Sequence, residues 1–240
     1  MSGSTRRIAR IGGGLAAVLA LAALGSLVAE EGAASNKFVG AAKCKNCHRA
    51  TGSGNQFGTW QKMEHAKAFA TLGEGEAREI AKKQGIDDPQ KSEKCLKCHV
   101  TAFSEPADRV TKKFDPKQGV QCESCHGPGE KHFKDRLAAA GGDEDEGDKA
   151  KEYVKIPEGE IVIEPAVDTC LKCHNSESPT YKPLCITSIA KEVLHFDPRK
   201  KRTDADVEAL KKKIADALAA KNAGCGGPEK CKKCQKAAGK

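Results

Sequence analysis

One short pattern, repeated four times, constrains the fold of this 240-residue chain more than any other feature. In each copy two Cys are separated by two residues, and a His follows the second Cys directly. The copies are Cys44, Cys47 and His48; Cys95, Cys98 and His99; Cys122, Cys125 and His126; and Cys170, Cys173 and His174. C-x-x-C-H is typical of c-type haem attachment, because two thiols at this spacing can form thioethers to both vinyl groups while the adjacent His ligates the iron. The alternatives, disulfides or zinc knuckles, do not require that His.

The sequence therefore predicts four covalently attached c-type haems, and the composition of the chain agrees. Val, Ile, Leu and Phe together make up 32 of the 206 residues that follow residue 34. A charged chain in which these residues fall below roughly 20% seldom buries enough apolar surface to offset its conformational entropy. We expect a mainly α-helical multihaem cytochrome c fold, with helices and loops wrapped around four packed haems and little or no β-sheet.

The N-terminus has the pattern of an export signal. Arg6, Arg7 and Arg10 precede residues 11–29, which are uncharged and rich in Leu and Ala. This run is also just long enough to span a bilayer if it is not cleaved. We expect residues 1–34 to be a signal peptide or an N-terminal anchor. The rest of the chain is expected to be exported to the periplasm, with a membrane-anchored or an extracellular location as the alternatives.

Three His lie outside the four motifs: His65, His132 and His195. Each could be an ordinary surface or hydrogen-bonded residue, but a haem iron with one motif His has a second axial position to fill. We predict that these three are distal ligands. Three residues cannot serve four irons, so one haem should be five-coordinate or should hold water, Lys or Met. Met63 lies two positions before His65 in a predicted helix, on a different face, and is expected to fill core space.

The motifs are too close together in the sequence for separate domains. Residues 35–200 are therefore predicted to form one tetrahaem domain, and residues 201–240 an amphipathic helix with a Lys- and Cys-rich tail. The amphipathic helix, at 204–221, would carry an apolar stripe of Val207, Leu210, Ile214 and Leu218. Further expected elements are helices at 60–72 and 76–84, a short strand at 161–163 and an acidic loop at 141–148.

Four further Cys lie outside the motifs: Cys185, Cys225, Cys231 and Cys234. Disulfides are favoured for them in an exported protein, with a Cys-ligated metal as the alternative, and their pairing cannot be deduced from sequence. Cys231, Cys234 and Gln235 look like a haem motif with Gln in place of His. Because Gln is a poor iron ligand, we do not expect a fifth haem.

The order of these elements resembles the tetrahaem cytochrome c-554 family of ammonia-oxidising bacteria. The matching stretches are AAKCKNCH, WQKMEHAKAF, KCLKCHV, GVQCESCHGPG with His132 after it, and CLKCHNSESP. The resemblance implies a mostly helical fold around four haems, three with two His ligands and the second five-coordinate. It also implies three axial pairs: His65 with the haem of His126, His132 with that of His48, and His195 with that of His174.

Electron relay between redox protein partners is the leading functional hypothesis, and in the resembling family the donor is hydroxylamine oxidoreductase. Enzymatic reduction of a small nitrogen species such as nitric oxide at an open haem of His99 is a second hypothesis. A third is a subunit of an extracellular cytochrome filament or a reductase complex. The net charge of +8 does not indicate nucleic-acid binding, because no basic stripe or reader motif accompanies it. A membrane is expected as a partner only if the N-terminus is uncleaved.

Overall fold

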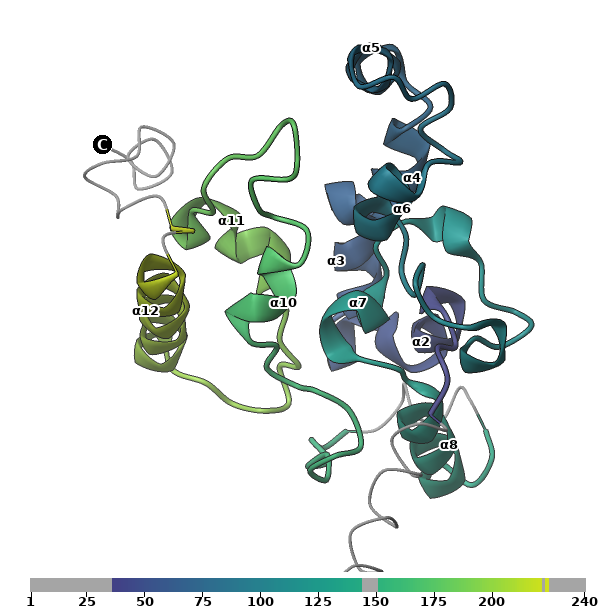
Figure 1. Cartoon of the computed structure of the whole chain (residues 1–240). Coiled ribbons are helices and arrows are strands. Elements are labelled where there is room, and N and C mark those ends of the chain that lie inside the picture. The colour runs from purple at the N-terminus through teal and green to yellow at the C-terminus, as the bar shows by residue number, and fades with distance from the viewer. Residues whose placement is uncertain (1–35, 144–150, 222, 225–240) are drawn as a thin grey trace, which may run out of the picture. The chain divides into compact units, whose positions relative to one another are not determined.

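The computed structural model of the chain describes residues 36–143, 151–221, 223 and 224 (Figure 1). The chain divides into two units, Met1–Asn36 and Lys37–Lys240, and the architecture below is that of the second. The predicted N-terminal signal or anchor at 1–34, most of the acidic loop at 141–148, and Cys225, Cys231 and Cys234 lie outside the described residues.

Short helices joined by loops make up the described part of the chain (Figure 1). The α-helices are α2 (Ala41–His48), α3 (Gln56–Lys62), α4 (Glu64–Thr71), α5 (Gly75–Lys83), α6 (Glu93–His99), α7 (Cys122–His126), α8 (Glu130–Ala139), α10 (Val167–Leu171), α11 (Ile186–Val193) and α12 (Asp204–Ala220). Three 3-10 turns accompany them: η1 (Thr51–Ser53), η2 (Ala107–Arg109) and η3 (Pro116–Gln118). Strand pairing among the described residues amounts to two isolated bridges, Phe38 with Val110 and Leu184 with Gly224. The prediction of a mainly α fold with little or no sheet is confirmed.

The prediction of one continuous helix at 60–72 is wrong in one respect, because the helix is interrupted at Met63. Met63 has an extended backbone, with φ −75° and ψ 151°, and separates α3 from α4. Its side chain is buried in a cluster with Ala41, Phe57 and Trp60. The interruption of the helix lets the Met63 side chain pack into the core. The prediction that Met63 fills core space is confirmed.

The predicted strand at 161–163 is also wrong. These residues form bends rather than a strand, and Val162 and Ile163 are exposed. The backbone of Val162 instead pairs with one residue of the third motif: its N–H donates to the carbonyl of His126 at 3.1 Å. The run of apolar side chains at 161–163 is typical of a buried strand. The backbone N–H of Val162, however, is hydrogen-bonded to a motif His and not to a neighbouring strand.

The other two predicted helices, at 76–84 and 204–221, are confirmed as α5 and α12. α12 begins with a capping box, in which Thr203 and Asp206 satisfy each other's backbone N–H groups. It packs against α10 and α11, and its Leu218 is buried in a second cluster with Val167 and Ala223. Both apolar clusters are small, as the low apolar content predicts.

Cys185, at the start of α11, is disulfide-bonded and buried. This confirms the expected disulfide chemistry for that residue. The bond lies beside the bridge of Leu184 with Gly224, where the Leu184 N–H donates to the carbonyl of Ala223 at 2.9 Å. No helix in the described part of the chain is long and apolar enough to cross a membrane.

Candidate haem centres

The four motifs are named here in chain order from first (44–48) to fourth (170–174), and the first three share one local structure. α2, α6 and α7 each end on the His of the first, second and third motif, and α10 contains Cys170 of the fourth. Because residues three apart lie on the same side of a helix, the two thiols of each of the first three motifs lie on one side of their helix. None of the eight motif Cys is in a disulfide, so disulfides within the motifs are not formed.

The His rings are arranged in pairs that bring each spare His to a motif His. His132 is stacked on His48 with ring centroids 6.2 Å apart, His65 meets His174 at 5.9 Å, and His195 meets His126 at 6.0 Å. A metal–imidazole bond is about 2 Å long, and the ring centroid lies about 1 Å behind the bonding nitrogen. Two imidazoles on one metal ion therefore have centroids about 6 Å apart. All three spacings fit an iron between the rings.

The structure pairs the His rings differently from two of the three axial pairs that the family resemblance implies. The pair of His132 with His48 is found, but His65 faces His174 and His195 faces His126, the reverse of what the resemblance implies. Packing explains the exchange. Val193 at the end of α11 and Cys122 of the third motif pack against the same buried cluster, which brings His195, two residues after Val193, to His126.

Hydrogen bonds to Nδ1 orient several of these rings. His99 donates to the carbonyl of Ala68 at 2.7 Å, and His126 donates to the carbonyl of Val162 at 2.6 Å. His132 donates to Glu160 Oε1 at 2.7 Å, and the Oε1 of Gln56 lies 3.3 Å from Nδ1 of His48. These partners can only accept, so the proton resides on Nδ1 and Nε2 is left with a lone pair. Nε2 is thus free to bind a metal.

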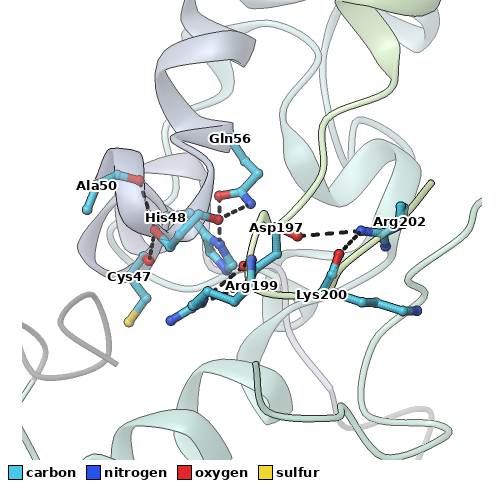
Figure 2. A network of polar contacts seen from close by, with 9 residues as sticks. Cys47, His48, Ala50, Gln56, Asp197, Arg199, Lys200 and Arg202 are labelled. Carbon is cyan, nitrogen blue, oxygen red and sulfur yellow. Dashed lines mark hydrogen bonds and ion pairs between the residues drawn. The ribbon is translucent and has the colours of Figure 1, made fainter. Parts of the chain in front are cut away.

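His48 of the first motif lies in a polar network (Figure 2). Gln56 approaches its ring, and the segment from Asp197 to Arg202 lies alongside. Arg199 donates to both carboxylate oxygens of Asp197, from Nε at 2.9 Å and from a terminal nitrogen at 2.7 Å. Burial raises the pKa of Asp197, but the bonds from Arg199 outweigh it and the pKa is lowered.

The buried His rings are held neutral by their surroundings. Burial, and then the charges of His126 and His48, lower the pKa of His195 to about 4. Burial and the charge of His174 lower the pKa of His65. The Nδ1 of His195 is buried and has no hydrogen-bond partner among the described residues. A neutral imidazole is the form that ligates a metal.

His99 differs from the other motif His. All seven His are among the described residues, and each of the other six pairs with a His ring at about the spacing of two ligands on one metal. The His99 ring has no such partner among them. The second motif is therefore the one left without a His on the opposite side.

The motif thiols lie close to one another across the chain. The Cys44 thiol is hydrogen-bonded to Cys122, which raises the pKa of Cys44 well above its usual value. Burial, and then Cys98, raise the pKa of Cys173 to about 12, while burial, and then Cys170, raise that of Cys125 to about 11. The first motif thus adjoins the third, the third adjoins the fourth, and the fourth adjoins the second. An ion pair of Lys97 with Glu177 also joins the second and fourth regions.

Glu123, inside the third motif, fixes the segment that leads into the first. It is 2% exposed. Its two carboxylate oxygens accept hydrogen bonds from the backbone N–H groups of Val39 and Gly40, both at 2.8 Å, and of Gly129 at 2.7 Å. The side chain of Gln121 accepts a further bond from the N–H of Ala41 at 2.7 Å. Residues of one motif region therefore hold the backbone of another.

Sequence reasoning missed three of these residues: Gln56, Glu123 and Glu160. Glu123 occupies a variable position of C-x-x-C-H, and Glu160 lies 28 residues from His132 in a loop. Gln56 lies close to the first motif, eight residues after His48. None of the three has a periodic or motif signal that marks it in a single sequence.

The helical fold and the paired His define a multihaem c-type cytochrome. Residues 43–127 match the family described as cytochrome c554 and c-prime. The chain is 30% identical over 174 residues to cytochrome c-554 of Nitrosomonas europaea, and the match covers 70% of this chain and 71% of that relative. The chain belongs to the cytochrome c-554 family, whose members are electron carriers with redox protein partners. No solved structure matches the chain.

Proposed function

We propose that this chain carries four c-type haems and relays electrons between periplasmic redox proteins. The thioether residues are Cys44, Cys47, Cys95, Cys98, Cys122, Cys125, Cys170 and Cys173. The proximal ligands are His48, His99, His126 and His174. Haems bound at these sites supply reversible one-electron chemistry between Fe(III) and Fe(II). The observation that carries this proposal is the set of three His pairs at the separation of two ligands on one iron.

The residues of this chain would hold three of the irons from both sides. His132 completes the first site, His195 the third and His65 the fourth. The Nδ1 hydrogen bonds described above orient rings in the first, second and third sites so that Nε2 faces the metal. The contacts among the motif thiols support a continuous row of sites in the order first, third, fourth and second.

The second site is proposed to be five-coordinate. His99 is its only His, and Met63, the one Met among the described residues, is buried in a core cluster. The open side favours a second candidate function, binding and reduction of a small nitrogen species such as nitric oxide. An open coordination position on the iron is necessary for reduction of such a species, but it is not sufficient.

Residues 1–34 are proposed to direct export and to be cleaved or retained as an anchor. The remainder is proposed to comprise the tetrahaem domain at 35–200 and the C-terminal helix and tail at 201–240. A hydroxylamine-oxidoreductase-like enzyme is proposed as the donor, by analogy with the family. Rapid mixing with such an enzyme and hydroxylamine should reduce the oxidised protein, whereas no reduction would contradict this donor.

Haem content and spin state test the central proposal. The reduced pyridine spectrum should show four haems per chain, and two or fewer would contradict the proposal. Paramagnetic resonance of the oxidised protein should show one high-spin and three low-spin irons. Four low-spin signals would contradict the open second site. Nitric oxide should oxidise the reduced protein over many turnovers if the second candidate function holds, and a single slow turnover would exclude it.

A further inference from the structure

A buried carboxylate lies behind one of the proposed distal ligands. The side chain of Glu160 is 2% exposed. Its Oε1 accepts a hydrogen bond from Nδ1 of His132 at 2.7 Å, and its Oε2 accepts one from a terminal nitrogen of Arg136 at 2.9 Å. Burial of an acidic side chain is costly unless it is paired and hydrogen-bonded, and here both oxygens are used.

Helix α8 supplies both partners of this carboxylate. His132 and Arg136 are four residues apart on α8 and therefore lie on the same face. Glu160 comes from the turn that precedes α10, where its own N–H donates to the carbonyl of Pro157 at 3.3 Å. The bond to Oε1 holds the His132 ring from behind and fixes its rotation. Arg136 holds the carboxylate in place, so that Glu160 is oriented independently of the ring.

The acceptor behind His132 differs in charge from those behind other motif and distal His. Nδ1 of His99 and Nδ1 of His126 each donate to a backbone carbonyl, which is neutral. Nδ1 of His195 is buried and finds no hydrogen-bond partner in the part of the chain that the structure describes. A charged acceptor draws the imidazole proton toward itself and makes the other nitrogen a stronger electron donor. A stronger donor stabilises Fe(III) over Fe(II), which lowers the reduction potential.

We propose that Glu160 is a tuning residue that lowers the reduction potential of the haem held between His48 and His132, by hydrogen bonding to Nδ1 of His132. The inference rests on the proposed function, since it requires that these two His hold one iron. It assigns to Glu160 a role in setting how readily this site accepts an electron. Glu160 does not touch the iron and acts through the ligand.

The test replaces the charge and keeps the shape. Glu160→Gln in the full haem-loaded protein retains an oxygen that can accept from His132 but removes the negative charge. His132→Ala identifies which low-spin signal belongs to the first site, because that signal should become high-spin. In a reductive titration followed by paramagnetic resonance, Glu160→Gln should move the midpoint of this one signal to a higher potential. The other three midpoints should stay where they are.

Glu130→Gln is the matched control. Glu130 is also on α8 and is ion-paired with Lys134 at 2.8 Å, with no His among its partners. The same change of charge there should leave all four midpoints unchanged. An unchanged midpoint of the first site in Glu160→Gln, or an equal shift of all four, would overturn the inference.

A second variant tests the inference if Glu160→Gln does not fold. Such a failure would follow if Arg136, left without its carboxylate partner, destabilises the protein. Glu160→Gln combined with Arg136→Gln removes both charges together, and a smaller rise in the first midpoint is expected, because only the effect of the charged acceptor on His132 is lost. No change in the spin state of any haem in His132→Ala would contradict the proposed ligand set rather than the role of Glu160. The two failures are therefore distinguishable.

Discussion

The rings of His48 and His132 are stacked, with centroids 6.2 Å apart and planes inclined by 20°. His48 ends α2, and His132 lies in the first turn of α8. The backbone N–H of Glu130, at the start of α8, donates to the carbonyl of Lys37 at 3.1 Å, and the Glu123 side chain binds both Gly129 and the segment before α2. The two rings are thus positioned by a network that does not involve either ring.

Removing His195 should open the third site and no other. His195→Ala is expected to convert one low-spin signal to high-spin and leave the other two low-spin signals in place, because His195 pairs with His126. Paramagnetic resonance of the oxidised protein measures this. His65→Ala is the paired comparison and should convert a different signal, that of the fourth site. Conversion of the same signal by both variants would contradict the two pairs.

Gly119 should tolerate no side chain. It has φ +74°, and a Cβ built on it would lie 2.6 Å from the backbone carbonyl oxygen of His65. Gly119→Ala is expected to destabilise the protein by about 1–3 kcal/mol and to disturb the fourth site by moving α4. Denaturant unfolding and the low-spin signal of the fourth site measure the two effects.

Gly75→Ala provides the control for Gly119→Ala. Gly75 is the first residue of α5, and a Cβ there would meet nothing within 4 Å. This substitution should be neutral or stabilising by up to about 1 kcal/mol. Equal stability of the two variants would show that the contact between Gly119 and His65 does not matter.

Glu123→Gln should weaken the attachment of the first motif to the third. Gln has one acceptor oxygen in place of two, so at least one of the three buried N–H groups loses its partner. A loss of about 1–3 kcal/mol is expected in the free energy of unfolding. Glu79→Gln, on the exposed side of α5, should change it little. A loss of the same size in both variants would contradict the role of Glu123.

The same residue should give the stability of the protein a pH dependence. Burial raises the pKa of Glu123 above its ordinary value, although its three N–H donors oppose this. The folded state then holds the proton more tightly than the unfolded state. The contribution is fully present below the unfolded pKa and is lost as the pH rises through the folded value. Unfolding midpoints measured across this range should show the decline in the wild type and lack it in Glu123→Gln.

Loss of haem at one site should reduce the stability of the fold as well as the haem absorbance. The described apolar clusters centre on three or four buried residues each, too few to hold a chain of this length together. Replacing Cys122 and Cys125 by Ala should reduce the haem count to three or fewer and remove cooperative thermal unfolding, measured by circular dichroism. Cys185→Ala should lower the stability by about 2–5 kcal/mol while retaining all four haems. Cooperative unfolding of the first variant would contradict a haem-dependent core.

The motifs and the three spare His could be read from sequence because haem attachment needs fixed residue types at fixed spacing. The partners of those His could not be predicted in the same way. Which motif His195 meets depends on where Val193 packs, and the placement of His65 depends on a bond from the N–H of Val120 to its carbonyl. Both are contacts between distant segments that leave no local pattern.

The break at Met63 and the bends at 161–163 went unforeseen for a related reason. At each place the local sequence favours a regular element, a continuous helix at 60–72 or a strand at 161–163, that the structure does not form. Met63 does so because its side chain reaches a buried cluster, and Val162 because its backbone N–H and carbonyl bind His126. In both places a tertiary contact outweighs the local propensity.

The contact between the thiols of Cys44 and Cys122 also bears on how the protein is made. In the folded chain these two sulfur atoms lie close together, and backbone bonds from Val39 and Gly40 to Glu123 hold the two segments together. Machinery that delivers a porphyrin must reach each sulfur before the segments dock. We therefore expect haem attachment at Cys44 and Cys122 to come before these two segments dock, and folding of the cytochrome to be the step that follows it.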